Sequence, residues 1–157
     1  MRFTKKSDYA LRLMETLGKA ETERLIPIKS ICESTNMTVK FMQSIVTDLV
    51  KSELVLTKSG PKGGIRLNRD PSQINVLEII EAVEGPINLM DCLEHPTQCG
   101  EYKSCSIITV MYSAQKAFVD NLKTWTLKLM IGAQSDPFKR VPAQHYQYPV
   151  QNCPAIK

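Results

Sequence analysis

The sequence contains no apolar run close to the roughly 20 residues that a bilayer-spanning helix needs. Its first stretch is interrupted by charged side chains at Lys5, Lys6 and Asp8, which a secretory signal segment would not tolerate. Dinucleotide fingerprints, phosphate-binding loops and recognisable nucleophile–base pairs are also lacking. We therefore expect a cytoplasmic protein with no membrane partner, and not an enzyme or an electron carrier.

The net charge of +4 is small, but the charges are unevenly distributed along the chain. Residues 1–70 carry 13 Lys and Arg against 8 Asp and Glu, whereas residues 71–105 carry 1 against 6. A basic first half followed by an acidic middle favours a polyanion such as double-stranded DNA as the partner of the first half. A solvated surface with uneven charge would show the same numbers, so charge alone leaves both interpretations open.

Hydrophobic periodicity predicts three helices in the first half, over residues 4–19, 27–32 and 39–52, with a tight turn at 34–36. Thr4 or Ser7 is the expected cap of the first helix, and Thr38 that of the third. Two short strands, 54–56 and 65–67, flank a basic turn rich in glycine, and a further helix over 74–84 ends at Gly85. The expected buried faces contain Ala10, Leu13, Met14 and Leu17 in the first helix, and Phe41, Met42, Ile45, Val46, Leu49 and Val50 in the third.

A helix-turn-helix followed by a basic hairpin is typical of a winged-helix DNA-binding domain, which we predict for residues 1–85. The third helix would enter the major groove, and the hairpin, or wing, would reach the backbone or the minor groove. An ordinary α+β domain with solubilising charges is the alternative. The side chains expected to read bases are Thr38, Lys40, Gln43 and Ser44. Those expected to neutralise phosphates are Lys58, Lys62 and Arg66 on the wing, with Arg2, Lys5 and Lys6 near the N-terminus.

Three of the five cysteines, Cys92, Cys99 and Cys105, fall within 14 residues, in a loop predicted over 86–105. Their thiolates are soft, anionic donors of the kind that holds iron–sulfur clusters. Six and five intervening residues are too wide for the CxxC pairs of structural zinc sites. Spacing alone nevertheless leaves open a cluster, a zinc site and three small buried residues. Cys32 is expected in the core beside Ile28 and Ile31, and Cys153 is expected to be free.

Residues 106–131 are predicted to form one long amphipathic helix, about 39 Å in length at 1.5 Å per residue. Its apolar residues recur three and four positions apart from Ile107 to Leu129, which makes one face continuously apolar. The rest of a small protein cannot cover so long a face, so a second copy of the chain is the expected cover. Packing of the helix onto its own winged-helix domain is the alternative. Residues 132–157 lack periodicity and are predicted to be a loosely ordered tail.

Three stretches together resemble the Rrf-two superfamily of bacterial regulators, the family of IscR and NsrR: MRFTKKSDYALRLM, IPIKSICESTNMTVKFMQSIVTDLVKSELV and GPKGGIRL. The resemblance covers residues 1 to about 130. It implies a mainly α fold with a small β-hairpin wing, in which a winged helix-turn-helix domain is followed by a long C-terminal dimerisation helix. It further implies a homodimeric transcriptional repressor that binds a palindromic operator.

The resemblance also favours an iron–sulfur cluster on Cys92, Cys99 and Cys105, because members that sense through a cluster carry three cysteines in this loop. A 4Fe–4S cluster is favoured over 2Fe–2S. The IscR type adds a histidine three positions after the last cysteine, where this sequence has Ile108. The NsrR type adds an aspartate from the first helix of the partner subunit, and Asp8 stands at that place. A first-turn carboxylate is also favoured by the helix dipole alone, and His95 is the next candidate ligand.

Two functions follow from this resemblance. The first is a regulator whose operator affinity is controlled by the cluster, with nitric oxide, oxygen, iron supply or cluster supply as the signal. The second is a cluster-free, thiol-based winged-helix regulator that acts through a protein partner. Visible absorption of an anaerobic preparation separates them.

Overall fold

A computed structural model of the chain describes residues 3–20, 23–35, 37–101 and 104–133. Arg2, Cys153 and nearly all of the predicted tail lie outside these residues. Two strands form one antiparallel hairpin, β1 (Val55–Lys58) and β2 (Gly64–Leu67). The helices are α1 (Lys5–Lys19), α2 (Ile28–Thr35), α3 (Val39–Lys51), α4 (Val76–Glu84), α5 (Asp91–Glu94), α6 (Ser106–Thr124) and α7 (Leu127–Gly132), with short 3₁₀ turns at Pro71–Gln73 and Pro96–Gln98. The predicted fold class, mainly α with a β-hairpin wing, is confirmed.

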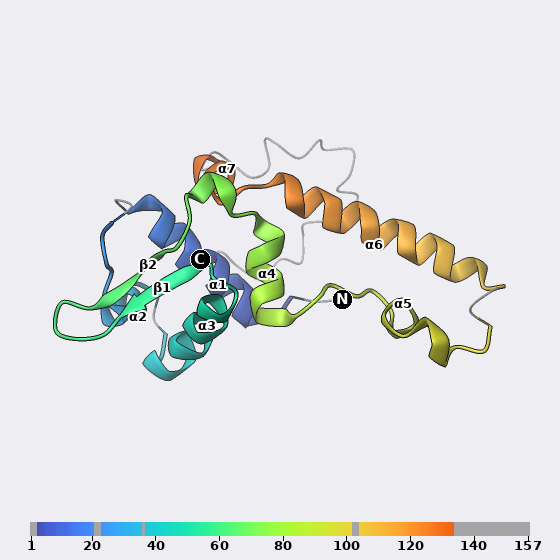
Figure 1. Cartoon of the computed structure of the whole chain (residues 1–157), viewed down its shortest axis with the longest axis horizontal. Helices are drawn as coiled ribbons and strands as arrows, with labels where there is room; N and C mark the ends of the chain where they lie inside the picture. Colours follow the sequence, from blue (N-terminus) through green and yellow to red (C-terminus); the bar gives the residue numbers. More distant parts are fainter. Residues whose placement is uncertain (1–2, 21–22, 36, 102–103, 134–157) are drawn as a thin grey trace, which may run out of the picture.

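Helix α1 is the centre of the main core and packs against α3, α4, α7 and β2 (Figure 1). Its four predicted core residues are all buried. Thr4 is its N-cap, because the Thr4 hydroxyl accepts a hydrogen bond from the Lys6 amide at 3.1 Å. Cys32 is buried in the same core, as the sequence predicted.

Helix α3 buries a narrower stripe than the sequence predicted. Met42, Ile45, Val46 and Leu49 are buried, but Phe41 and Val50 are exposed. The Phe41 ring instead lies edge-on to the ring of Tyr9, with centroids 6.0 Å apart. The side of α3 opposite this stripe is therefore left for polar residues.

The wing is built on glycines at two kinds of position. Gly60 has φ +110°, which an L side chain rarely adopts. Gly63 has no such φ, but a Cβ there would lie 2.2 Å from the Lys58 carbonyl oxygen, so a side chain does not fit. Ile26 forms an isolated bridge to β2, because its amide and carbonyl both pair with Ile65 at 2.9 Å.

Two predicted helix boundaries are corrected. The helix predicted over 74–84 begins at Val76, after an Asn75–Glu78 capping box, and ends at Gly85 with φ +83°. The single helix predicted over 106–131 is wrong: α6 ends at Thr124, and α7 begins at Leu127 with Thr126 as its cap. Helix α7 returns onto α1, so the last part of the segment packs on its own domain.

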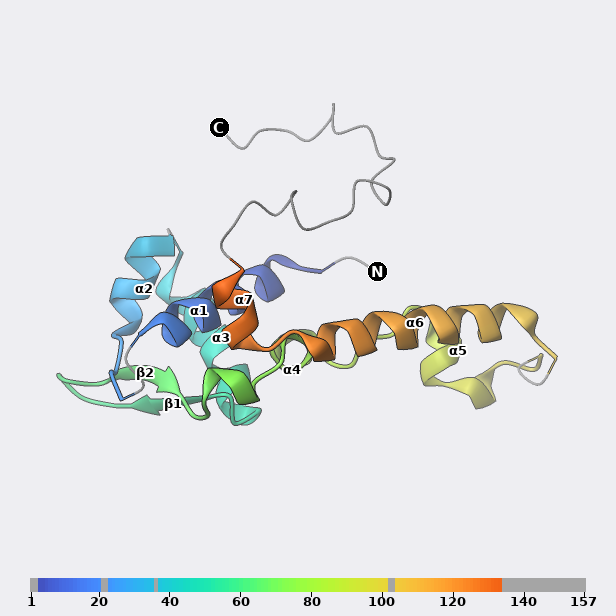
Figure 2. The same cartoon turned by 90° about the horizontal axis from the view of Figure 1, so that it is seen from above.

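Helix α6 leaves the domain as a projecting arm (Figures 1 and 2). Its inner end packs against α4 through Phe118, Val119 and Leu122, which form a second apolar cluster with α4. Its outer end is uncovered, since Ile107 and Val110 are 61% and 66% exposed. Among the described residues, no helix is both long enough and apolar enough to cross a membrane.

Candidate DNA-reading surface and cysteine loop

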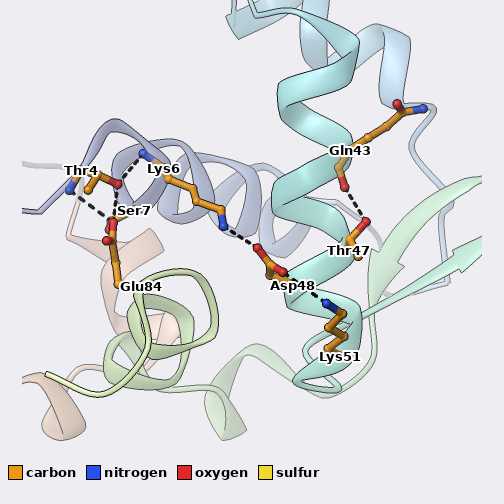
Figure 3. A network of polar contacts seen from close by, with 8 residues as sticks. All are labelled: Thr4, Lys6, Ser7, Gln43, Thr47, Asp48, Lys51 and Glu84. Atoms are coloured by element: carbon orange, nitrogen blue, oxygen red, sulfur yellow. Dashed lines mark hydrogen bonds and ion pairs between the residues drawn. The ribbon is translucent and has the colours of Figure 1, made fainter.

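The solvent side of α3 carries the side chains that the sequence predicted to read bases. Lys40, Gln43 and Ser44 are exposed there, opposite the buried stripe. Figure 3 shows the amide end of Gln43 pointing away from the helix body, while its backbone carbonyl accepts a 2.8 Å bond from the Thr47 hydroxyl. Thr38 is exposed as well, but its hydroxyl caps the helix by accepting from the Phe41 amide at 3.4 Å.

A cleft of about 280 Å³ separates α3 from the wing. Gln43 lines it from α3, Lys58 from the wing, and Lys29 from the first turn of α2. Lysines on two sides, with the glycine backbone of the wing between them, suit the phosphate backbone of a duplex. Our sequence prediction missed Lys29. A basic residue two positions after the proline that opens the first helix of the motif would have indicated it.

The side chains predicted to contact phosphates differ in their exposure and in whether a carboxylate already lies beside them. Lys58 and Lys62 are exposed on the wing. Arg66 is half-buried, donates to the Leu67 carbonyl at 3.2 Å and lies 3.9 Å from Glu23. The side chain of Lys6 is turned inward, with its ammonium 2.5 Å from Asp48. The two wing lysines are thus better placed for DNA than Arg66 or Lys6.

The three loop cysteines are half-exposed free thiols. Cys92 lies in the short helix α5, Cys99 follows the 3₁₀ turn, and Cys105 is the N-cap residue of α6. Gln115 of α6 fastens the start of the loop: its side-chain oxygen accepts from the Leu89 amide at 2.9 Å, and its amide nitrogen donates to Asn88 at 3.4 Å. The start of the loop is therefore hydrogen-bonded to α6.

The described part of one chain does not assemble a finished metal site, because no three His, Cys, Asp or Glu side chains there lie close enough together. His95 is exposed, with its Nε2 atom 4.0 Å from Glu94, and Ile108 offers no donor atom. Three free thiols on one loop nevertheless fit an iron–sulfur cluster in donor chemistry. The donor atoms of Cys92, Cys99 and Cys105 therefore suit an iron–sulfur cluster.

Asp8 is exposed on α1, where both of its carboxylate oxygens accept from the Arg12 guanidinium at 3.1 Å. Helix α5 and the outer end of α6 lie well away from α1 in both views (Figures 1 and 2). Within one chain, Asp8 therefore does not join the cysteine loop. A second copy of the chain is needed to bring such a carboxylate to the loop.

Cys32 differs from the loop cysteines in its surroundings. Burial, with the nearby Glu33 carboxylate as a smaller cause, raises the pKa of its thiol above the ordinary value. A thiol whose thiolate is disfavoured is a poor nucleophile and a poor metal ligand. Cys32 is thus suited to core packing.

A helix-turn-helix with an exposed polar face, a basic wing cleft and a projecting helix that carries a cysteine loop define a winged-helix transcriptional regulator. The Rrf2 family, described as an iron-dependent transcriptional regulator, matches residues 3–133. The chain belongs to this family, which confirms the resemblance found in its sequence.

The named relatives are transcriptional regulators that match this chain over most of their length. The HTH-type transcriptional regulators NsrR of Oceanobacillus iheyensis and Bacillus licheniformis are 33% and 31% identical over 132 residues, which is 83% of this chain and 90% and 92% of theirs. Among solved structures, T. potens IscR has a TM-score of 0.67 at 22% identity, covering 93% of this chain and 96% of that one. CymR, the global cysteine regulator of B. subtilis, has 0.66 at 23%, covering 84% and 97%. These two structures show the fold.

Proposed function

We propose that this regulator binds a palindromic DNA operator as a homodimer in the cytoplasm, and that an iron–sulfur cluster controls its operator affinity. Cys92, Cys99 and Cys105 would hold the cluster, with Asp8 of the partner subunit as the fourth ligand. The observation that carries the proposal is the set of three free, half-exposed thiols on a loop fastened to the projecting helix α6. The NsrR-named relatives support the cluster. Asp8, at the place of the NsrR-type ligand aspartate, favours nitric oxide over oxygen, iron supply or cluster supply as the signal.

Operator reading is assigned to α3 and the wing. The Gln43 amide has the donor and acceptor needed to bind an adenine edge, and Lys40 suits guanine or a phosphate. Lys29, Lys58 and Lys62 would neutralise phosphates on either side of the cleft. In this division α3 sets sequence preference and the lysines supply affinity.

Dimerisation is assigned to the outer apolar face of α6. Ile107 and Val110 are largely exposed on an arm whose inner end alone is covered by its own domain. A two-fold axis that crosses this arm, so that the two α6 helices run antiparallel, would give two α3 helices, which must lie about 34 Å apart to enter successive major grooves. The same axis would bring Asp8 of the partner subunit toward the cysteine loop.

When bound, an iron–sulfur cluster supplies redox-active iron that small oxidants and nitric oxide can reach. Asp8 would contribute a hard oxygen donor beside soft thiolates, and such a ligand is more easily released. Because α1 carries Asp8 and packs against α3, releasing Asp8 would free the reading domain of one subunit from the arm of the other. A shift away from the binding-competent spacing then lowers operator affinity.

The test begins with anaerobic purification and measurement of visible absorption, iron and sulfide per chain. We expect a brown protein whose affinity for a selected operator changes at least about tenfold when a chelator removes the iron. Cys32→Ala serves as the control and should keep colour and response. A protein that stays colourless after reconstitution, or equal affinities with and without iron, would contradict the proposal.

The second candidate is a cluster-free thiol-based regulator that acts through a protein partner. One observation favours it: a structural neighbour is the oxidised form of Staphylococcus aureus CymR, with a TM-score of 0.64 at 27% identity, covering 83% of this chain and 96% of that one. It predicts an iron-free protein whose DNA binding responds to thiol oxidants. The same absorption and iron measurements distinguish it from the first candidate.

A further inference from the structure

The first turn of α1 is held between two charged side chains from elements far away in sequence (Figure 3). On one side is Glu84, the last residue of α4. On the other is Asp48, in the last turns of α3. Both contacts are made by residues 4–7, the N-cap and first turn of α1, so a movement of α3 or α4 acts on the same turn.

The contact with α4 is a set of hydrogen bonds to one carboxylate oxygen. Glu84 Oε1 accepts from the Thr4 amide at 3.3 Å and from the hydroxyls of Thr4 and Ser7. Ser7 is 1% exposed and is the one polar residue buried among those that the structure describes. Directly after Glu84, Gly85 ends α4 and the chain runs on to the cysteine loop. This contact therefore ties α1 to the root of that loop.

The contact with α3 is the ion pair between Lys6 and Asp48, with nitrogen and oxygen 2.5 Å apart. Both side chains are about three-quarters covered, at 27% and 25% exposed, so solvent screens the pair less than an exposed one. Lys51 is a second, more distant cation, 3.9 Å from Asp48. Asp48 comes one residue after Thr47, which bonds the Gln43 carbonyl. The pair thus fastens α1 to the helix that carries the reading face.

We propose that Lys6, Asp48 and Glu84 are positioning residues that clamp the first turn of α1 between α3 and the root of the cysteine loop. Lys6 then acts on operator affinity through the orientation of α3, and not by contacting a phosphate as its charge and place in the sequence suggested. This inference rests on the proposed DNA binding. It adds a route from the loop to the reading helix that needs no ligand from the partner subunit.

The two possible roles of Lys6 predict opposite effects of an Asp48 substitution on operator affinity. If Lys6 bound a phosphate, Asp48 would compete for the same ammonium, and Asp48→Asn would strengthen operator binding. If Lys6 positions α3, Asp48→Asn loosens the helix and weakens binding. Lys6→Gln alone does not separate the roles by affinity, but a lost phosphate contact also lowers the salt slope by about one unit.

The experiment uses a duplex that the wild-type chain selects from a random-sequence library, with affinity measured by fluorescence anisotropy at several salt concentrations. We expect Lys6→Gln and Asp48→Asn each to weaken binding about tenfold with the wild-type salt slope, and the exchanged pair Lys6→Asp with Asp48→Lys to recover most of it. Lys19→Gln, which breaks the exposed Lys19–Glu15 ion pair at the other end of α1, is the matched control. Tighter binding by Asp48→Asn, or no recovery in the exchanged pair, would overturn the clamp.

Amide hydrogen exchange without DNA separates this inference from the proposed function. Lys6→Gln and Asp48→Asn should speed exchange in the last turns of α3, and Glu84→Gln should speed it in the first turn of α1 and in α3. If the wild-type chain selects no duplex, the proposed function fails, while the exchange result still decides on the clamp. Unchanged exchange in α3 in all three variants would reject it.

Discussion

The backbone amide of Leu127 donates to the carbonyl oxygen of Ile74 at 2.7 Å, across a separation of more than fifty residues. The Val76 amide donates to the Trp125 carbonyl at 2.8 Å, so two hydrogen bonds fasten the link between α6 and α7 to the segment before α4. Leu127 itself is completely buried. The direction in which the α6 arm leaves is therefore set by the domain at its base.

Truncating that anchor should cost stability. Leu127→Ala removes a fully buried side chain from the main core and should lower the free energy of unfolding by about 2–5 kcal/mol. Urea denaturation followed by circular dichroism measures this loss. Leu129→Ala, at an exposed position two residues on, should stay within about 0.5 kcal/mol of wild type. Equal losses of stability at the two positions would show that the Leu127 side chain does not anchor α7 in the core.

Base reading and phosphate binding should separate in two variants. Gln43→Ala should relax operator preference, because one bidentate base contact discriminates by roughly 1–3 kcal/mol. Lys62→Ala should weaken all duplexes alike and reduce the salt slope by about one unit. Competition binding with matched and mutated operators, repeated at several salt concentrations, measures both. Unchanged discrimination in Gln43→Ala would mean that α3 does not read the bases as proposed.

Cluster binding should depend on the loop cysteines and not on the buried one. Cys99→Ala should lose most iron and visible absorption, because one of three thiolates is gone. Cys32→Ala should keep both, and should lower stability by about 1 kcal/mol because the smaller side chain fills the core less well. Iron analysis and absorption spectra of anaerobic samples measure cluster binding in both variants. Full iron content in Cys99→Ala would remove that residue from the ligand set.

The exposed end of α6 should govern the oligomeric state. Val110→Glu places a charge on the uncovered apolar face and should convert the proposed dimer to a monomer, since burying an unpaired charge in an interface is costly. Thr109→Glu is the matched control, because Thr109 is exposed and lies about 100° around the helix from Val110 and about 160° from Ile107, away from the apolar face. Sedimentation velocity measures both. A dimer in Val110→Glu would place the interface elsewhere.

Acid stability should report on the Glu84 contact. Burial alone would raise the pKa of Glu84, but the hydrogen bonds from Ser7 and Thr4, helped by the nearby Lys6 charge, outweigh it and hold the pKa below its ordinary value. A lowered folded-state pKa stabilises the fold above the unfolded pKa, about 4.3, and this stabilisation is lost as pH falls through the folded value. Wild type should thus lose its advantage over Glu84→Gln below about pH 4.

That comparison comes from unfolding free energies measured from about pH 3 to about pH 7, a range that brackets the ordinary Glu pKa of about 4.3. Ser7→Ala should remove part of the same pH dependence, because it deletes one of the donors to the carboxylate. A constant difference between wild type and Glu84→Gln at every pH would show that the carboxylate charge is not what the contact stabilises.

The exposed face of α3 proposed to read DNA could largely be located from the sequence, and the arrangement of the cysteine loop only in part. Lys40, Gln43 and Ser44 were placed by the periodicity of α3, because a helix with one buried face necessarily exposes the other. Lys29 was missed, since its place in the wing cleft depends on how α2 packs beside the hairpin. Cys92, Cys99 and Cys105 were identified by residue type, but spacing along a loop does not specify how its thiols are arranged. Their role as ligands stays a prediction.

The sequence by itself determined the elements whose physical cause is local. The capping hydroxyls of Thr4 and Thr38, the four core positions of α1 and the Gly60 turn all follow from interactions within a few residues. The tertiary structure decided what depends on distant partners. Helix α6 stops at Thr124 because the next backbone groups pair with Ile74 and Val76, and the charge of Lys6 is turned inward because Asp48 lies beside it. Such pairings depend on packing between elements, which local periodicity does not record.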